Sequence, residues 1–180
     1  MNEKILVTYA SRSSSTAGVA EAIGKTLVEE GRQVEVLPLN EIKDLAPYRA
    51  VVVGSAIHGG QWLPEAMQFV KTHQEELARK PFAPFLVCMT LALNGKLAGT
   101  RPPGDIHEQV VAWLNPVCAL VKPVSKGLFA GALNIDKIPS LTDRLKFRLS
   151  VILGVWSEGD HRDWHAIHNW AKKLIPLLTV

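Results

Sequence analysis

The chain has 180 residues, of which 47% are hydrophobic, and a formal net charge of +3 at pH 7. This size and composition favour one globular domain over residues 1–180 and exclude a disordered chain. No apolar run reaches the roughly 18 residues typical of a membrane span, and the first residues lead directly into a predicted strand, so we expect a cytoplasmic protein without a secretory signal. The charge favours an anionic ligand, an acidic partner or an anionic membrane surface. No nucleic-acid partner is expected, because the chain lacks a basic run interleaved with aromatic residues.

Residues 9–16 (YASRSSST) connect a predicted strand to a predicted helix. The strand is the apolar run of residues 5–9, and the helix is indicated by apolar residues at helical spacing, which are Val19, Ala20, Ile23 and Leu27. The turn carries four serines, a threonine and an arginine where the helix dipole favours negative charge. This pattern predicts a phosphate-binding loop. The alternative is a loop that only caps its helix, with Ser15 or Thr16 as the N-cap.

The next segments continue the alternation of strands and helices. Residues 33–39 predict an edge strand, because Pro38 cannot donate a hydrogen bond to a neighbouring strand. Residues 50–55 predict a central strand that is buried on both faces, and it ends in a loop over residues 55–62 with two adjacent glycines. Apolar spacing then indicates a helix over residues 63–77.

The second half of the chain repeats this pattern. Residues 85–89 predict another buried strand, which opens into a long loop rich in glycine and proline over residues 90–105. Helical spacing resumes over residues 106–117, where Pro116 is expected to kink or end the helix. The last two predicted elements are a strand at residues 127–133 and a closing helix at residues 164–175 that is capped by Asp163.

Strands that alternate with helices predict a parallel α/β sheet covered by helices on both faces. Ligands of such sheets bind outside the carboxyl ends of the strands, at the point where the strand order reverses. The loops at residues 11–16, 55–62 and 90–95 follow the first, third and fourth predicted strands. We therefore expect these three loops to converge on one crevice.

These motifs resemble those of the flavodoxin-like family over nearly the whole chain. The similarity lies in the SRSSST loop after the first strand, GSAIHGGQW after the third and the extended loop after the fourth. Within that superfamily the chain is most similar in appearance to the menaquinone-dependent protoporphyrinogen IX dehydrogenases, through SRSSST, VVVGSAIHGGQWLPEAMQFVKTH, and an AGAL strand followed by a basic and apolar insertion. The resemblance implies a flavodoxin-like three-layer sandwich, a five-stranded parallel sheet in the order 2-1-3-4-5 and an FMN cofactor.

The resemblance also implies which residues hold FMN. The phosphate would be bound by Ser11, Arg12, Ser13, Ser14, Ser15 and Thr16. One side of the isoalloxazine ring would be lined by Ser55, Ala56, Ile57, His58, Gly59, Gly60, Gln61 and Trp62. The other side would be lined by Thr90, Leu91, Ala92, Leu93, Asn94 and Gly95. Neither flanking loop has a tyrosine, so ring stacking would fall to Trp62 or be absent. His58 is the candidate catalytic residue for tuning the flavin or transferring a proton, and the alternative is a histidine that only hydrogen-bonds the backbone.

Residues 141–156 form an insertion with the spacing of an amphipathic helix. Arg144 and Arg148 lie one turn apart beside its apolar face. One interpretation is a helix that packs into the core and leaves its arginines solvated. The other is a helix that lies on an anionic membrane or against an apolar substrate bearing carboxylates. The segment is too short to span a bilayer.

The resemblance implies an FMN-dependent oxidoreductase of heme biosynthesis that passes electrons from a porphyrinogen-type substrate to a quinone, and the basic and apolar insertion is consistent with peripheral contact with the inner face of the membrane. One alternative is an electron carrier that docks on redox partner proteins, which the mildly basic charge disfavours. A third interpretation is a domain that has lost its flavin.

No metal site is expected, because His161, His165 and His168 lack a clear ligand spacing. Cys88 and Cys118 are expected to be reduced thiols.

Overall fold

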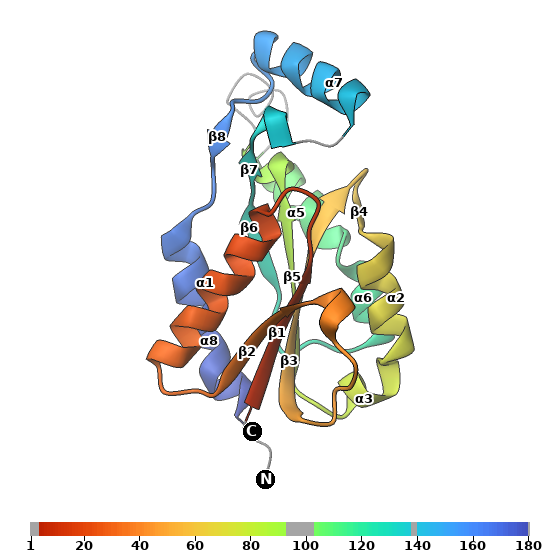
Figure 1. The fold of residues 1–180 in the computed structure, drawn as a ribbon, viewed down its shortest axis with the longest axis vertical. Coiled ribbons are helices and arrows are strands. Elements are labelled where there is room, and N and C mark those ends of the chain that lie inside the picture. The colour runs from red at the N-terminus through yellow and green to blue at the C-terminus, as the bar shows by residue number, and fades with distance from the viewer. Residues whose placement is uncertain (1–3, 93–102, 138–139, 180) are drawn as a thin grey trace.

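A five-stranded parallel sheet forms the middle layer of the computed structural model, which describes residues 4–92, 103–137 and 140–179 (Figure 1). The strands run in the order β2 (Val34–Pro38), β1 (Lys4–Ala10), β3 (Tyr48–His58), β5 (Phe82–Cys88) and β6 (Gly127–Ala130). The short strand β4 (Gln61–Trp62) pairs antiparallel with the end of β3. Because β4 only extends β3 as a hairpin, the predicted order 2-1-3-4-5 is confirmed, and β2 is the expected edge strand.

Helices cover both faces of this sheet (Figure 1). Two of them pack against each other on one face, and these are α1 (Ser15–Glu29) and α8 (Trp164–Leu178). The other face carries α2 (Pro64–Thr72), α3 (Gln74–Ala78), α5 (Pro103–Ala112) and α6 (Asn115–Leu120). The described residues also form short 3-10 helices, which are η1 (Leu39–Glu41), η2 (Met89–Ala92) and η3 (Ile135–Lys137).

Alternation along the buried strands divides the apolar side chains between two cores. In β1, Ile5 and Val7 lie in the core under α1 and α8, whereas Leu6 and Ala10 lie in the core under α2 and α6. All seven residues of β5 are buried. A central strand covered on both faces explains why the sequence shows continuous apolar runs rather than an alternation of apolar and polar residues.

Several predicted boundaries were wrong in detail. The helix expected over residues 63–77 is divided into α2 and α3 at His73, and the one over 106–117 is divided into α5 and α6. Pro116 lies in the first turn of α6, where a proline is tolerated. Residues 55–58 continue β3 instead of forming a loop.

The strand predicted at residues 127–133 is interrupted at Gly131. Its second part, β7 (Ala132–Leu133), leaves the main sheet and pairs antiparallel with β8 (Gly159–Asp160). Between these two strands the chain forms η3 and the predicted insertion helix, α7 (Leu141–Ile152). We call residues 132–160, which contain β7, η3, α7 and β8, the arm.

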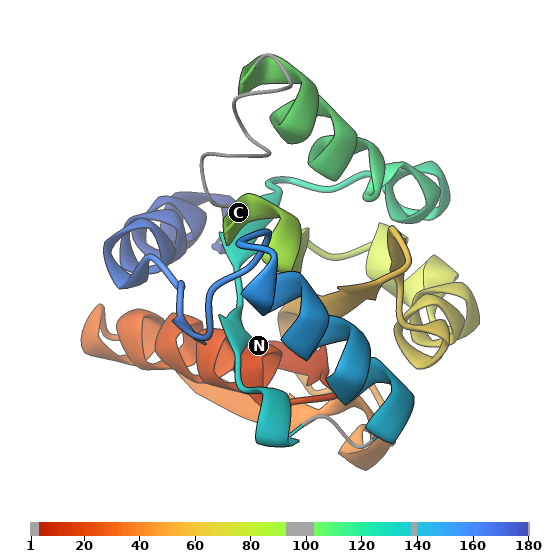
Figure 2. The same ribbon diagram turned by 90° about the horizontal axis from the view of Figure 1, so that it is seen from above.

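The helix α7 lies beyond the carboxyl ends of the parallel strands, outside the three layers (Figures 1 and 2). It begins with Ser140 as N-cap, whose side chain accepts a hydrogen bond from the Asp143 N–H. None of its twelve residues, all of which the structure describes, is buried, and Leu141, Leu145 and Ile152 are 77%, 71% and 80% exposed. The interpretation of this segment as a core-packing helix was therefore wrong. No helix in the described parts of the chain is long and apolar enough to cross a membrane.

Candidate functional site

The hydroxyl-rich loop ends where α1 begins, at Ser15. The N-cap is Ser14, and its side chain makes no capping hydrogen bond. Its φ of 65° lies in the left-handed region, which serine adopts at a cost in free energy. The interpretation of the loop as a simple cap formed by Ser15 or Thr16 was therefore wrong. The backbone at Ser14 turns so that the loop runs directly into the positive end of the helix dipole.

The buried hydroxyls of this loop differ in their partners. Ser15 Oγ accepts a hydrogen bond of 2.9 Å from the Ala132 N–H in β7. Ser11 Oγ and Thr16 Oγ1 are buried, and neither has a partner among the described residues. A buried hydroxyl without a partner destabilises a fold, and the first turn of a helix also leaves N–H groups free of helical partners. An anion at this end of α1 would accept hydrogen bonds from both kinds of donor, so these residues fit a phosphate group.

Arg12 lies at the outer edge of the same loop. Its side chain is 62% exposed, and its Nη2 atom is 3.5 Å from Glu65 Oε2 in α2. An ion pair this exposed contributes little to stability, so the guanidinium is held only loosely. Arg12 can therefore turn toward an anion in the loop at little cost.

The second predicted segment forms the tip of the β3–β4 hairpin. Gly59 and Gly60 have φ values of 60° and 76°, which explains why glycines occupy this turn. His58 and Gln61 pair across it, and both are exposed. Ser55 lies deeper and is fully buried, and its Oγ donates to the Ala56 carbonyl and accepts from the Leu63 N–H. The Ser55 hydroxyl therefore fixes the start of α2.

Trp62 packs into the core beside α2 and is 4% exposed. The indole ring therefore has no free face on which a flavin ring could stack. Stacking was expected either to fall to Trp62 or to be absent, and the structure favours its absence. Another tryptophan, Trp113 in the segment predicted as a helix over residues 106–117, approaches the hairpin tip. A Cβ atom on Gly60 would lie 3.1 Å from Trp113 Nε1. The helical spacing around residue 113 gave no signal of this contact.

The third predicted segment follows β5. Thr90, Leu91 and Ala92 lie in η2 and are half-buried, whereas Leu93, Asn94 and Gly95 lie outside the described residues. The pairing of Ala10 with Ser55 and of Ala56 with Val87 places the carboxyl ends of β1, β3 and β5 side by side. The loops after these strands therefore meet at one edge of the sheet, as expected. Burial raises the pKa of Cys88 at the end of β5 to about 11, so this thiol is protonated at neutral pH.

The flavodoxin domain model matches residues 6–154 of the chain. The chain belongs to the flavodoxin domain family. The domain is similar to a solved flavodoxin of Streptococcus pneumonia TIGR4, with a TM-score of 0.56 and 14% identity over 96% of this chain and 98% of that one. A short-chain flavodoxin associated with a non-canonical PDU bacterial microcompartment gives a TM-score of 0.57 and 14% identity over 98% of this chain and 99% of that one. The predicted flavodoxin-like three-layer fold is thus confirmed.

A curated relative adds a more specific likeness. Protoporphyrinogen IX dehydrogenase [quinone] of Leishmania major is 27% identical over 185 residues, which cover 97% of this flavodoxin domain and 75% of the relative. The aligned region covers nearly the whole chain and therefore includes the arm.

A cavity of about 550 Å³ opens on the arm side of the hydroxyl-rich loop of this flavodoxin domain. Its walls include Ser13, Ser14 and Ser15 from the loop and Arg162 from the segment before α8. Sequence reasoning missed Arg162, because no spacing pattern connects residue 162 to a loop that lies almost 150 positions earlier. Its side chain donates a 3.5 Å hydrogen bond from Nη1 to the Ser15 carbonyl oxygen.

Two histidines near the C-terminus of the flavodoxin domain make hydrogen-bond contacts within the fold. His168 Nδ1 lies 2.6 Å from Thr26 Oγ1 between α8 and α1, and His161 Nε2 contacts the Ser157 carbonyl at 2.7 Å. Within the described ranges, no group of three or more His, Cys, Asp or Glu side chains could hold a metal ion. Cys88 and Cys118 are free thiols.

Proposed function

We propose that the chain is an FMN-binding oxidoreductase of the quinone-linked protoporphyrinogen IX dehydrogenase type. The observation that carries the cofactor is the N-terminus of α1, where the buried Ser11 Oγ and Thr16 Oγ1 have no partner among the described residues. The 27% identical relative supports the reaction type. The mild net charge of +3 also suits an enzyme that meets a carboxylate-bearing substrate and an anionic membrane.

In this proposal the hydroxyl-rich loop binds the phosphate of FMN. The hydroxyls of Ser11 and Thr16 would donate hydrogen bonds to it, as would the N–H groups of the first turn of α1. Bound FMN supplies the redox chemistry, because its isoalloxazine ring accepts electrons from a substrate and passes them on. The β3–β4 hairpin, residues 55–62, would flank one side of the ring, and η2 would flank the other.

His58 is the proposed group for proton transfer near the ring. It lies at the tip of β3, is exposed and pairs through its backbone with Gln61 across a turn of two glycines. A neutral imidazole at this position can accept a proton that a substrate releases on oxidation and return it to solvent. Substitution of His58 by Gln should therefore lower the turnover number more than the affinity for FMN.

The arm is the proposed contact with substrate and membrane. Arg148 of α7 pairs with the exposed Asp136 at 3.4 Å, and Arg144 lies one turn before it. The exposed leucines on the adjacent face match an interfacial helix, which buries its apolar side in a lipid headgroup layer while basic residues meet anionic lipid. A quinone dissolved in the bilayer would then be close to the carboxyl ends of the strands.

The second candidate is an electron carrier that docks on redox partner proteins. The flavodoxin fold itself favours it, since the solved neighbours are flavodoxins. The two candidates differ in one respect that can be measured, because a carrier passes electrons to a protein and needs no porphyrinogen.

Anaerobic turnover of the FMN-loaded protein with protoporphyrinogen IX tests the proposal. Porphyrin fluorescence is followed with and without a menaquinone analogue, against a flavin-free sample that reports autoxidation of the substrate. We expect porphyrin formation that requires both FMN and quinone. A flavin that is reduced and reoxidised chemically while no porphyrin forms above the flavin-free sample would contradict the enzyme and favour the carrier.

A further inference from the structure

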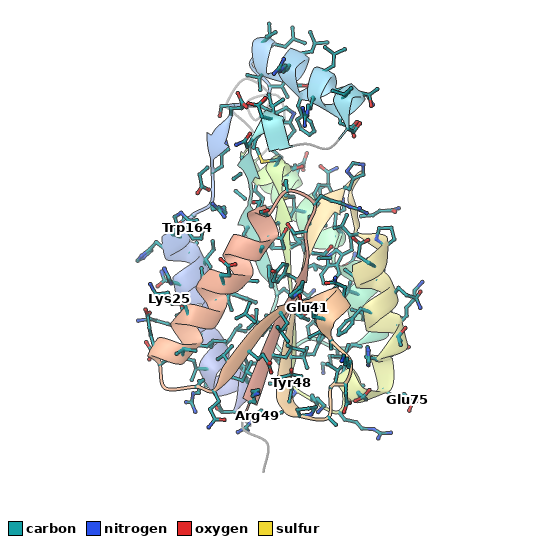
Figure 3. The ribbon with its side chains drawn as sticks, in the orientation of Figure 1. Lys25, Glu41, Tyr48, Arg49, Glu75 and Trp164 are labelled. Carbon is teal, nitrogen blue, oxygen red and sulfur yellow. The ribbon has the colours of Figure 1, made fainter. Side chains whose placement is uncertain are left out.

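Arg162 lies between β8 and α8, and three different elements hold its side chain. Its Nε and Nη2 atoms each donate a 2.7 Å hydrogen bond to the Asp160 carboxylate in β8. The Trp164 ring at the start of α8 lies under the guanidinium, with the ring centroid 4.3 Å from Arg162 Cζ (Figure 3 labels Trp164). Nη1 contacts the Ser15 carbonyl in the first turn of α1. The side chain is therefore fixed and only 17% exposed.

Helix α1 makes room for this guanidinium at Gly18. Glycine inside a helix is less favourable than alanine, so its presence one turn into α1 calls for a reason. A Cβ atom at Gly18 would overlap Arg162 Nη1 and would lie 3.6 Å from Cζ. The absence of a side chain at Gly18 thus lets Arg162 lie directly against the first turn of the helix.

The charges around Arg162 leave it able to act on an anion. The cavity of about 550 Å³ brings Ser13, Ser14 and Arg162 together with three carboxylates of the arm. Each of these carboxylates has a partner, because Asp136 pairs with Arg148, Glu158 accepts from the Ile135 N–H and Asp160 accepts from Arg162. Asp160 orients the guanidinium, and Nη1 points to the helix turn that carries the proposed phosphate site.

We propose that Arg162 is a positioning residue for the phosphate of FMN. It holds the first turn of α1 in place through the Ser15 carbonyl, while the ion pair with Asp160 fixes the orientation of its guanidinium. The inference rests on the proposed function and assigns a role to a residue outside the three predicted loops. Riboflavin, which has the same ring system but no phosphate, should bind independently of Arg162.

Flavin affinity of the Arg162→Met variant tests this role. Quenching of flavin fluorescence gives the Kd of FMN and of riboflavin for the flavin-free protein. We expect the FMN Kd to rise about tenfold, as for loss of a charged hydrogen-bonding group, and the riboflavin Kd to change less than about twofold. Lys172→Met is the matched control, because Lys172 also ties α8 to α1, through Glu30 at 3.1 Å, but at the opposite end of α1.

Gly18→Ala provides a second variant that keeps the arginine. The new methyl group displaces the guanidinium, whereas alanine favours the helix, so this variant should fold well even if Arg162→Met does not. We expect it to weaken FMN and spare riboflavin, and to add nothing further in combination with Arg162→Met.

The outcomes separate this inference from the proposed function. Equal losses of FMN and riboflavin affinity, or an unchanged ratio of the two Kd values in both variants, would overturn the positioning role while the FMN site stands. A parent protein that does not bind FMN more tightly than riboflavin would overturn the phosphate site itself, and the role of Arg162 with it.

Discussion

Ser14 shows how a single residue of the hydroxyl-rich loop is held in an unfavourable conformation. It is the non-glycine residue with a positive φ in the part of the chain that the structure describes, and its exposed side chain does not cap α1. Strain of this kind persists where the surrounding structure determines the backbone, and it is common at ligand sites. The conformation turns the loop into the N-terminus of α1, where we propose the phosphate site.

We therefore expect Ser14→Gly to stabilise the flavin-free protein by about 0.5 to 1 kcal/mol, because glycine adopts this φ without a steric cost. Urea unfolding followed by circular dichroism measures the change. Ser13→Gly is the control, since Ser13 has no positive φ and glycine there should only increase the entropy of the unfolded chain. Equal effects of the two substitutions would show that Ser14 is not strained.

Tyr48 lies at the end of the sheet remote from α7, where its hydroxyl donates a 2.8 Å hydrogen bond to Glu35 (Figure 3). Burial, followed by the hydrogen bond to Glu35, raises the pKa of Tyr48 to about 12. The same hydrogen bond, with one from Lys4, lowers the pKa of Glu35. These residues connect β1, β2 and β3 at the amino ends of the strands.

The raised pKa of Tyr48 predicts how stability depends on pH. Its contribution is fully present below pH 10.0, the ordinary pKa, and is lost as the pH rises toward about 12, because the unfolded chain releases the proton first. Between about pH 10 and about pH 11 we expect a loss of roughly 1 kcal/mol in the free energy of unfolding. Tyr48→Phe should reduce this slope, measured by urea unfolding at several pH values. Identical slopes for both proteins would contradict the raised pKa.

At the scale of single residues the sequence predicted the site only in outline. The four serines and the threonine of residues 11–16 indicate an anion site, but their spacing does not reveal which hydroxyls already have partners. The Ser15 hydroxyl accepts a hydrogen bond from Ala132, which is more than a hundred positions away, whereas the Thr16 hydroxyl has no partner in the part of the chain that the structure describes. Long-range pairs of this kind, like that of Arg162 with Ser15, depend on the folded chain and leave no local pattern.

At the scale of secondary structure, the hydrophobic pattern predicted the long elements, missed β4 and β8, and did not separate β7 from β6. Strands β1, β3 and β5 are long apolar segments that are covered by helices on both faces, so their composition is sufficient to predict them as strands. Strands β4, β7 and β8 have two residues each and exist only because a distant segment or a tight turn pairs with them. The periodicity of residues 141–156 also predicted the apolar face of α7, but it could not show whether that face packs into the core or is exposed.

The exposed face of α7 leads to a prediction at the same scale. We expect the flavin-loaded protein to co-sediment with vesicles that contain phosphatidylglycerol, and to do so less as the salt concentration rises. Replacing both Leu145 and Leu149, which are 71% and 56% exposed, with Glu should abolish binding, because burial of each leucine contributes on the order of 1.5 kcal/mol.

The matched control for this experiment is Val28→Glu, since Val28 is an exposed apolar residue of α1, outside the arm. This variant should bind vesicles like the parent protein. A parent protein that stays in the supernatant at low salt, or a control that loses binding to the same extent, would rule out α7 as the membrane contact.

At the scale of the whole molecule, the two ends of the sheet differ in how well their polar groups are satisfied. At the amino ends of the strands, Tyr48 binds Glu35 and Lys80 donates to the carbonyl oxygens of Leu45 and Tyr48. At the carboxyl ends, Ser11 and Thr16 keep buried hydroxyls without partners among the described residues. Arg32 Nε, just before β2 at the amino ends, is also buried without a partner among the described residues, and Trp62 Nε1 after β3 is another such atom at the carboxyl ends. More of these groups therefore lie at the end of the proposed phosphate site, as expected when stability is exchanged for binding.

Substitutions in α1 test this exchange across the whole molecule. Thr16→Val keeps the shape of a residue that is 1% exposed but removes its unpartnered hydroxyl, so the flavin-free protein should become more stable by about 1 kcal/mol. FMN affinity should fall about tenfold, because a donor to the phosphate is lost.

Thr26→Val is the matched control in the same helix, since Thr26 is equally buried but its Oγ1 donates to the Ala22 carbonyl and contacts His168. Here the flavin-free protein should lose about 1 kcal/mol of stability and FMN affinity should stay constant. Urea unfolding without flavin and fluorescence titration with FMN give the two quantities for each variant. Stability changes of opposite sign, together with a loss of FMN affinity in Thr16→Val alone, would identify the Thr16 hydroxyl as a group that the fold keeps for its ligand. If Thr16→Val instead destabilises the protein as Thr26→Val does, the hydroxyl has a structural partner and the phosphate site must lie elsewhere in the crevice.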